Sequence, residues 1–353
     1  MISTKIIKID PLFPEQKYLQ EAAQVLAKGG LVILPTETVY GIAANMLNPK
    51  AVDRLYAIKN RSPDKPFSLH IDTKEKLEDF AQDIPVLAYK LINKFWPGPL
   101  TIILKSKDNH NVGLRLPDND IALSIIREAK VPLVCPSANI SGKPAPINFL
   151  EAIKDLKGLV DFAIDAGPTK LQIESTVVDL TVEPLKVFRE GAIKKEEIEA
   201  VAAKKTVLFI CTGNSCRSVM AKGLLEKRLK EQGRQDVEVL SAGILILTGL
   251  GVTEETRQLL AQEGIDASGH RSQRVSKEML KGSDIILVME KIHEEKILEL
   301  APEVKNRVFL LKEFAKINDN NLNIEDPIGK PEEFYSQTFE IVKEAVERII
   351  KII

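Results

Sequence analysis

A cysteine and an arginine separated by five residues form the clearest chemical motif in the chain. The segment Cys211-Thr-Gly-Asn-Ser-Cys-Arg217-Ser218 follows the apolar run TVLFI and leads into a stretch with a helical pattern. Backbone N–H groups in such a loop converge on an anion at the helix N-terminus. A thiol there is held as thiolate and can attack phosphorus, while Arg217 can grip two phosphoryl oxygens. The alternative is a buried cysteine at a strand end and a solvated arginine.

Asp326 is the candidate proton donor for this chemistry. The sequence Asp326-Pro327-Ile328-Gly329 places a carboxylate on a loop stiffened by proline. Cleavage of a phosphoryl bond needs an acid that protonates the leaving group. Taken alone, Asp326 is equally compatible with a simple turn residue.

The first half of the chain contains neither a GxxxxGK[ST] loop nor a GxGxxG turn followed by a helix. The common nucleotide-binding fingerprints are therefore absent from it. Polar clusters take their place, at Pro35–Gly41, Lys59-Asn60-Arg61, Lys65-Pro66, Phe95–Thr101, Ser137-Ala-Asn139, Glu174-Ser-Thr176 and Arg189. Taken singly, the basic residues are typical of a solvated face, and the Ser-Ala-Asn turn is typical of a helix cap.

Apolar runs and helical patterns indicate the elements that position these residues. In the second half the runs Val237–Leu240, Ile285–Met289 and Val308–Leu311 alternate with helical patterns at Glu254–Glu263 and Phe334–Ile350. This alternation predicts a doubly wound parallel α/β sheet with a phosphate-binding loop. In the first half, short strands separated by Pro and Gly turns predict a twisted, mixed α/β sheet with helices. Those strands are expected at Leu31–Leu34, Leu100–Leu104, Leu133–Cys135 and Ser175–Asp179.

The segment Gly191–Lys205 is charged, rich in alanine and poor in large apolar residues, which predicts a terminal helix plus a connector. The length of 353 residues also suits two domains. We therefore predict one domain over residues 1–200 and a second over residues 204–353.

The composition excludes several classes of protein. Forty-nine Lys and Arg against 50 Asp and Glu give a net charge of -1, and aromatic residues make up 5% of the chain. The sequence shows neither a basic stripe nor aromatic residues placed for stacking on bases. Direct, stable nucleic-acid binding is therefore not expected. Three cysteines cannot build a disulfide framework, the N-terminal segment lacks a signal-peptide core, and no apolar run is long enough for a membrane span. These features predict a cytoplasmic protein with reduced thiols and no membrane association.

The second half resembles the low-molecular-weight phosphotyrosine phosphatase family, whose signature begins in such a phosphate loop and closes with an Asp-Pro loop. Ser241-Ala-Gly-Ile244 matches a further family segment. The resemblance implies that Cys211 is the nucleophile of a cysteinyl-phosphate intermediate, Arg217 the phosphate clamp and Asp326 the general acid and later base, without a cofactor. It also implies a phosphate loop formed by Thr212, Gly213, Asn214, Ser215, Cys216 and Ser218, in which Asn214 organises the loop and Ser218 donates to the thiolate.

Three features bear on the substrate, which the family implies to be a phosphoprotein. Ile328 follows the Asp-Pro pair, and no aromatic residue lies between Val239 and Leu260, so the site is poorly equipped to hold a tyrosine ring. Ser215 stands where protein-arginine phosphatases carry Thr, and DPIGKPEEFYSQT resembles their loop. The resemblance therefore favours phosphoarginine, with phosphotyrosine as the alternative. No cysteine follows Cys216, which disfavours the arsenate reductase branch.

Cys216 lies five residues after Cys211. Two interpretations of this spacing remain open. One is a protective, reversible disulfide between the two sulfur atoms under oxidant, and the other is a small packed residue.

The first half resembles the YrdC/Sua5 family of threonylcarbamoyl-AMP synthases over nearly all of residues 15–195. The Lys-x-Arg and Ser-x-Asn pairs that mark synthases stand here as Lys59/Arg61 and Ser137/Asn139. The resemblance implies that L-threonine, bicarbonate and ATP give threonylcarbamoyl-AMP and pyrophosphate. Downstream threonylcarbamoyl transferase proteins would then use the product for the t6A37 modification of tRNA.

The family's chemistry suggests roles for individual residues. Pyrophosphate release needs cations, and Mg²⁺ is expected to accompany ATP. No set of residues for a protein-bound metal is found. The predicted ATP-binding residues are Lys59, Arg61, Lys65, Ser137, Asn139 and Arg189. The predicted threonine-binding residues are Thr38, His70, Arg115 and Ser175, with Arg115 on the carboxylate. Cys135 is interpreted as part of the cavity wall.

Two hypotheses of other classes compete with a fusion of two enzymes. One half could be a catalytically silent module that senses threonine and ATP, or a phosphoprotein, for the other half. A protein that binds RNA in its own right is the second hypothesis. The presence of every expected catalytic residue argues against the first, and the charge and aromatic content argue against the second.

Overall fold

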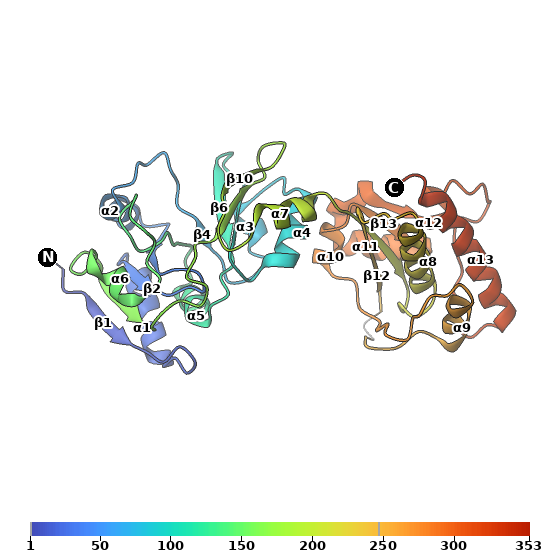
Figure 1. The fold of residues 1–353 in the computed structure, drawn as a ribbon, viewed down its shortest axis with the longest axis horizontal. Coiled ribbons are helices and arrows are strands. Elements are labelled where there is room, and N and C mark those ends of the chain that lie inside the picture. Colours follow the sequence, from blue (N-terminus) through green and yellow to red (C-terminus); the bar gives the residue numbers. More distant parts are fainter. Residues whose placement is uncertain (1, 246–247) are drawn as a thin grey trace. The chain divides into compact units, whose positions relative to one another are not determined.

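The computed structural model describes residues 2–245 and 248–353 (Figure 1). The chain divides into two compact units between Glu199 and Ala200, each with its own hydrophobic core. Helix α7 (Lys195–Ala202) spans this division and ends shortly before the first strand of the second unit.

The first unit is an α/β structure built on one long sheet. Its strands are β1 (Lys5–Lys8), β2 (Val32–Leu34), β3 (Gly41–Asn45), β4 (Leu69–His70), β5 (Leu100–Lys105), β6 (Asn111–Arg115), β7 (Leu133–Val134), β8 (Phe162–Asp165), β9 (Thr176–Asp179) and β10 (Lys186–Arg189). Its helices before α7 are α1 (Gln16–Ala27), α2 (Pro49–Lys59), α3 (Leu77–Phe80), α4 (Val86–Phe95), α5 (Asp120–Ala129) and α6 (Phe149–Lys154).

The strand order is β1-β8-β2-β3-β7-β4-β6-β5-β9-β10. Parallel pairs such as β5 with β9 alternate with antiparallel pairs such as β5 with β6, so the sheet is mixed. Helices α1 and α5 pack together over one end of the sheet. In α1 the buried residues Leu19, Ala22, Ala23 and Leu26 recur at helical spacing, which gives the helix its core face.

The second unit contains a smaller sheet with helices on both faces. Its elements are β11 (Lys205–Cys211), α8 (Arg217–Glu231), β12 (Val237–Gly243), α9 (Glu254–Gln262), α10 (Lys277–Lys281), β13 (Ile285–Val288), α11 (Lys291–Leu300), the 3-10 helix η1 (Pro302–Arg307), β14 (Val308–Leu310), α12 (Leu311–Phe314) and α13 (Glu332–Ile349).

The four strands of this sheet are parallel and lie in the order β12-β11-β13-β14. Alternation along β11 buries Val207 and Phe209 with helices α8 and α13 on one face, and Leu208 and Ile210 with α11 on the other. The chain leaves β11 for β12 on one side and later returns to β13 on the other side. The carboxyl ends of β11 and β13 therefore form the crevice where ligands bind in such sheets.

The predicted α/β class is confirmed in both halves: a mixed sheet in the first and a doubly wound parallel sheet in the second. Most predicted strands are found within one or two residues of their expected ends. The helix within Gly191–Lys205 is shorter than the segment itself and covers Lys195–Ala202. None of the helices in the described residues has the length and apolarity that would let it cross a membrane.

Candidate functional sites

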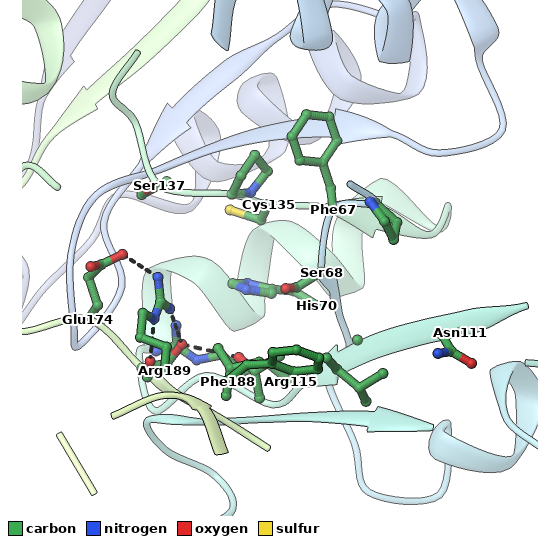
Figure 2. A pocket seen from close by; sticks show the side chains of 18 of the residues that line it. Phe67, Ser68, His70, Asn111, Arg115, Cys135, Ser137, Glu174, Phe188 and Arg189 are labelled. Carbon is green, nitrogen blue, oxygen red and sulfur yellow. Dashed lines mark hydrogen bonds and ion pairs between the residues drawn. The ribbon is translucent and has the colours of Figure 1, made fainter. Parts of the chain in front are cut away.

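A cavity of about 850 Å³ opens on the first unit, above strands β5, β6, β9 and β10 (Figure 2). Its wall gathers polar groups from segments far apart in the sequence. Six of the sequence-predicted site residues line it: Arg61, His70, Arg115, Ser137, Ser175 and Arg189. Thr38, Lys59, Lys65 and Asn139 are not among the lining residues. The cavity thus brings together most of the predicted threonine-binding and ATP-binding side chains.

Arg115 ends β6 on the cavity floor and is already paired with a carboxylate. Its Nη2 donates to Glu37 Oε1 at 2.7 Å and to Thr38 Oγ1 at 2.9 Å. Both members of the Arg115–Glu37 pair are buried. Glu37 Oε2 has no hydrogen-bond partner among the described residues. The sequence did not indicate a role for Glu37, although this residue lies within the polar cluster Pro35–Gly41.

Arg189 holds the edge of the cavity formed by β10. Its guanidinium donates to the Ser175 carbonyl oxygen at 3.0 Å and to Ser175 Oγ at 3.1 Å, and it forms an ion pair with Glu174 (Figure 2). Ser175 Oγ also lies 3.1 Å from Thr101 Oγ1. Burial lowers the pKa of Arg189, and Glu174 opposes that shift. The arginine is thus fixed in place before any ligand arrives.

Lys59 does not line the cavity but holds the Ser137–Asn139 turn of the predicted ATP site. Its Nζ donates to the carbonyl oxygens of Ser137 and Asn139 at 2.6 and 2.8 Å, and to Asn139 Oδ1 at 3.3 Å. Burial lowers the pKa of Lys59 to about 8. Ser137 Oγ in turn donates to Asn139 Oδ1 at 2.6 Å. The Lys-x-Arg and Ser-x-Asn pairs are therefore physically coupled, with Lys59 holding the turn whose Ser137 reaches the cavity.

His70 and Cys135 are neutral parts of the cavity wall. His70 is buried, and its pKa lies well below the usual value because of desolvation and the nearby Arg115. Its Nδ1 is buried and has no hydrogen-bond partner among the described residues. Burial raises the pKa of Cys135 to about 12, which keeps this thiol protonated. Arg61 sits near this wall and donates to the carbonyl oxygens of Lys65 and Pro66 at 2.8 and 3.1 Å.

The phosphate loop of the second unit begins where β11 ends. Cys211 is buried, and its Sγ lies 3.0 Å from Ser218 Oγ and 3.3 Å from the backbone nitrogen of Asn214. Asn214 adopts a left-handed backbone conformation with φ of 53°. Its side chain donates to Ser218 Oγ and Ser241 Oγ, both at 3.0 Å, and accepts from the backbone N–H of Gln273 at 3.0 Å. These bonds fix the loop around the sulfur atom and offer it donors.

Arg217 opens helix α8 and is almost completely buried beneath the loop, with 1% of its surface exposed. It forms ion pairs with Asp326 and Glu290. It also donates to the Ile324 carbonyl oxygen at 2.7 Å and to Thr212 Oγ1 at 3.0 Å. The structure therefore brings Cys211, Arg217 and Asp326 into one site. Glu290 belongs to the same site, and sequence reasoning did not find it.

His293 is a second residue that sequence reasoning missed. It is fully buried, its Nδ1 accepts from the Glu290 backbone N–H at 3.0 Å, and its Nε2 lies 3.0 Å from Thr212 Oγ1. This pattern places the ring proton on Nε2, and burial lowers the pKa to about 4. A signal was present, because Glu290 and His293 follow the run Ile285–Met289 at the carboxyl end of a parallel strand.

The remaining loop residues define the rim of the site. Ser215 Oγ and Thr253 Oγ1 lie 3.7 and 3.4 Å from Cys216 Sγ, and burial raises the pKa of the Cys216 thiol. Cys211 and Cys216 are both unpaired. Ile328 is half exposed beside Asp326, whose Oδ1 accepts from the Ile328 N–H at 3.2 Å. Aliphatic surface therefore flanks the proposed acid.

Comparisons with known proteins match a different family to each of the two units. The family model Sua5_yciO_yrdC, described as "Telomere recombination", matches residues 24–191, and the model of low molecular weight phosphotyrosine protein phosphatase matches residues 206–353. The threonylcarbamoyl-AMP synthase of Pyrococcus abyssi is 38% identical over 230 residues, covering 63% of this chain and 67% of that protein. A protein-arginine-phosphatase of Geobacillus stearothermophilus is 36% identical over 143 residues, covering 40% of this chain and 92% of that protein.

Among solved structures, that of P. abyssi Sua5 complexed with L-threonine matches with a TM-score of 0.54 and 29% identity, covering 87% of this chain and 99% of the other. Fold, sites and sequence together define a fusion of two α/β enzyme units. The chain belongs to the YrdC/Sua5 family through its first unit and to the low-molecular-weight phosphotyrosine phosphatase family through its second. The predicted families and the prediction of two enzymatic halves are confirmed.

Proposed function

We propose that residues 1–200 synthesise threonylcarbamoyl-AMP from L-threonine, bicarbonate and ATP, and that residues 204–353 dephosphorylate phosphoproteins, with preference for phosphoarginine. The observation that carries the first activity is the convergence of Arg61, Arg115 and Arg189 on one cavity of the first unit. Three cations in one concave site suit a substrate set that holds a carboxylate, a bicarbonate and a triphosphate.

Different side chains of the cavity suit different ligands. In this proposal Arg115 and Ser175 donate to the carboxylate and hydroxyl groups of threonine, and the hydrogen bond to Glu37 keeps Arg115 oriented. The neutral His70 forms part of the wall around the threonine side chain without adding a charge. Arg61, Arg189 and Ser137 hold the phosphates as pyrophosphate leaves, and the Lys59 brace keeps Ser137 in position.

Magnesium enters this proposal as a partner of ATP. Among the described residues no group of three His, Cys, Asp or Glu side chains is arranged to hold a metal ion. Mg²⁺ in nucleotide sites is typically held by one or two carboxylates together with the phosphates, and Asp64, Glu174 and Asp179 all line the cavity. The adenylate product would pass to separate threonylcarbamoyl transferase proteins that act on tRNA.

Threonine-dependent release of pyrophosphate tests the first activity. The full chain is incubated with ATP, Mg²⁺ and bicarbonate, with and without L-threonine, and threonylcarbamoyl-AMP is identified by mass spectrometry. Arg189→Met should lower the rate at least tenfold, because a fixed cation on the phosphates is lost. Lys105→Met, an exposed lysine at the end of β5, is the matched control and should react normally. Pyrophosphate release that does not depend on threonine would contradict the proposal.

The second activity rests on the buried Cys211 thiol within reach of Ser218 Oγ and the Asn214 N–H, together with the buried Arg217 that opens the helix after this loop. The Cys211 thiolate attacks phosphorus and displaces the guanidine nitrogen of phosphoarginine, which takes a proton from Asp326. A water molecule then attacks the cysteinyl-phosphate, giving its proton to Asp326. Orthophosphate leaves, and the thiolate and the protonated acid are restored. The phosphatase needs no cofactor for these steps.

The preference for phosphoarginine is supported by the rim of the site. Ser215 contributes a small hydroxyl to the phosphate loop, and the exposed Ile328 is aliphatic and not aromatic. The 36% identical protein-arginine-phosphatase relative supports the same preference. Ile328 itself offers a phenol no ring to stack on.

Parallel assays on phosphoarginine and phosphotyrosine peptides test the preference. Purified full chain should release phosphate from phosphoarginine several-fold faster, and Cys211→Ser provides the blank. Faster release from phosphotyrosine would instead leave a tyrosine phosphatase. No release that depends on Cys211 would make the second unit a binding module.

A further inference from the structure

We propose that Glu290 is a positioning residue of the phosphatase site, which anchors Arg217 through Nη1 and supplies the counter-charge that lets Asp326 leave that arginine and act as the acid. The inference rests on the proposed phosphatase function of the second unit. It assigns a role to a residue that lies outside both the phosphate loop and the Asp-Pro loop.

The fold delivers Glu290 to this position. It directly precedes helix α11, one residue after the buried Met289 and two after the end of β13. Strand β13 pairs in parallel with β11, which ends at Cys211. The two strand ends therefore open into the same crevice, one carrying the thiol and the other carrying the carboxylate.

The hydrogen bonds of Arg217 indicate which contacts stay and which must change. Nη1 donates to Glu290 and to the Ile324 carbonyl oxygen, while Nη2 donates to Thr212 Oγ1 and Asp326. Nε is buried and has no hydrogen-bond partner among the described residues. A guanidinium that grips two phosphoryl oxygens uses two neighbouring N–H groups on one edge. Nε and Nη2 form that edge, so the contact with Asp326 must give way, whereas the contact with Glu290 can remain.

Charge leads to the same assignment. Arg217 is 1% exposed, and a buried guanidinium is costly without a counter-charge. If Asp326 were its sole carboxylate, the arginine would hold that acid ionised and in contact. Glu290 provides a second carboxylate, so Asp326 is free to carry a proton towards the leaving group while Arg217 stays neutralised.

His293 closes the arrangement. Its ring accepts from the Glu290 backbone N–H and donates to Thr212 Oγ1, which also accepts from Arg217 Nη2. These contacts connect Glu290 to Arg217 through His293 and Thr212. They therefore hold both residues of the Arg217–Glu290 ion pair in position. This network ties the start of α11 to the phosphate loop.

The test compares Glu290→Ala and Glu290→Gln with Glu295→Gln, an exposed glutamate on the same helix. Inorganic phosphate binding is measured by calorimetry, and kcat and KM are measured on a phosphoarginine peptide. Glu290→Ala should weaken phosphate binding and lower kcat about tenfold or more, the usual effect of losing a charge-assisted contact. Glu290→Gln keeps an acceptor for Nη1 and should restore phosphate affinity, while kcat stays low because the counter-charge is missing.

The inference is overturned if Glu290→Ala binds phosphate and turns over like the wild type, or if Glu290→Gln restores nothing. Glu295→Gln should match the wild type in both measurements. If thermal melts show that Glu290→Ala does not fold, Glu290→Gln still tests the inference. A low kcat together with normal phosphate affinity in that variant is expected only if Glu290 has the proposed role. If the wild-type chain shows no Cys211-dependent turnover, the proposed phosphatase function is wrong. Phosphate binding by the wild type and the Glu290 variants, measured by calorimetry, would still test whether Glu290 positions Arg217.

Discussion

Each site of this chain contains a buried arginine whose carboxylate partner sequence reasoning left unassigned. Arg115 pairs with Glu37 in the first unit, and Arg217 pairs with Glu290 as well as Asp326 in the second. An unpaired buried charge costs several kcal/mol, so a guanidinium can be pre-placed for an anion only if a carboxylate accompanies it. The partner also fixes which N–H groups remain for the ligand. We therefore propose that both arginines are held in a fixed orientation for an anionic ligand.

Acid should destabilise the second unit through His293. Burial lowers its folded-state pKa to about 4, below the ordinary value of 6.5. Between these values the unfolded chain binds a proton that the folded unit excludes. The contribution of neutral His293 to the free energy of unfolding is therefore fully present above about pH 6.5. As the pH falls towards about 4, the free energy of unfolding decreases by about 3 kcal/mol. Hydrogen exchange of the β11 and β13 amides measures this loss in the second unit.

The matched variant for this prediction is His293→Gln, which cannot take up the proton. Its β11 and β13 amides should lose less protection between pH 6.5 and pH 4 than those of the wild type. An equal loss in both proteins would assign the acid sensitivity to other groups.

The sequence revealed the parts of each site that lie within a single local segment. Cys211, Arg217 and Ser218 share one loop, so their spacing alone predicted their joint action on phosphate. Glu290 and Glu37 escaped because a carboxylate acquires its role here by meeting an arginine 73 and 78 residues away, respectively. Such meetings depend on strand order, which local patterns do not encode.

At the scale of elements, the end of β12 lies directly against the phosphate loop. A Cβ atom added to Gly243 would lie 2.7 Å from the Thr212 carbonyl oxygen and 2.9 Å from the Asn214 nitrogen. Both are backbone atoms, which cannot rotate away as a flexible side chain could. The glycine therefore permits the close approach that lets Asn214 bond to Ser241 on β12.

Gly243→Ala should lower phosphatase activity at least tenfold with little loss of synthase activity, because the methyl group displaces the loop backbone, including the Asn214 N–H that contacts Cys211 Sγ. Gly251→Ala is the matched control, since a Cβ atom there meets nothing within 4 Å. Phosphate release and threonine-dependent pyrophosphate release are measured on the same preparations. Normal phosphatase activity in Gly243→Ala would show that the loop can shift without loss of function.

Strand positions were easier to predict than strand partners. The apolar runs at Val237, Ile285 and Val308 each became a strand of the second sheet. In the first unit, β1 pairs with β8 in the register Lys5 with Phe162, a partnership across most of the domain. Composition can indicate that a segment is extended, whereas its neighbour depends on how the whole sheet buries its faces.

At the scale of the whole molecule, the chain carries two candidate sites, one on each of two units with separate cores. Every residue that lines the synthase cavity belongs to the first unit, and the groups that surround Cys211 belong to the second. The net charge of -1 also provides no overall field through which one site would attract the other's anionic substrate.

The two activities should therefore be energetically independent. In the full chain, Cys211→Ser should abolish phosphate release and leave threonine-dependent pyrophosphate release within about twofold of the wild type, and Arg189→Met should do the reverse. Substitutions without shared partners behave additively, so the double variant should lose both activities without further effect. Because coupling between ligand sites is reciprocal, threonine and ATP should leave the affinity for inorganic phosphate unchanged. A shift in that affinity on adding the synthase substrates would instead demonstrate communication and give the fusion a regulatory purpose.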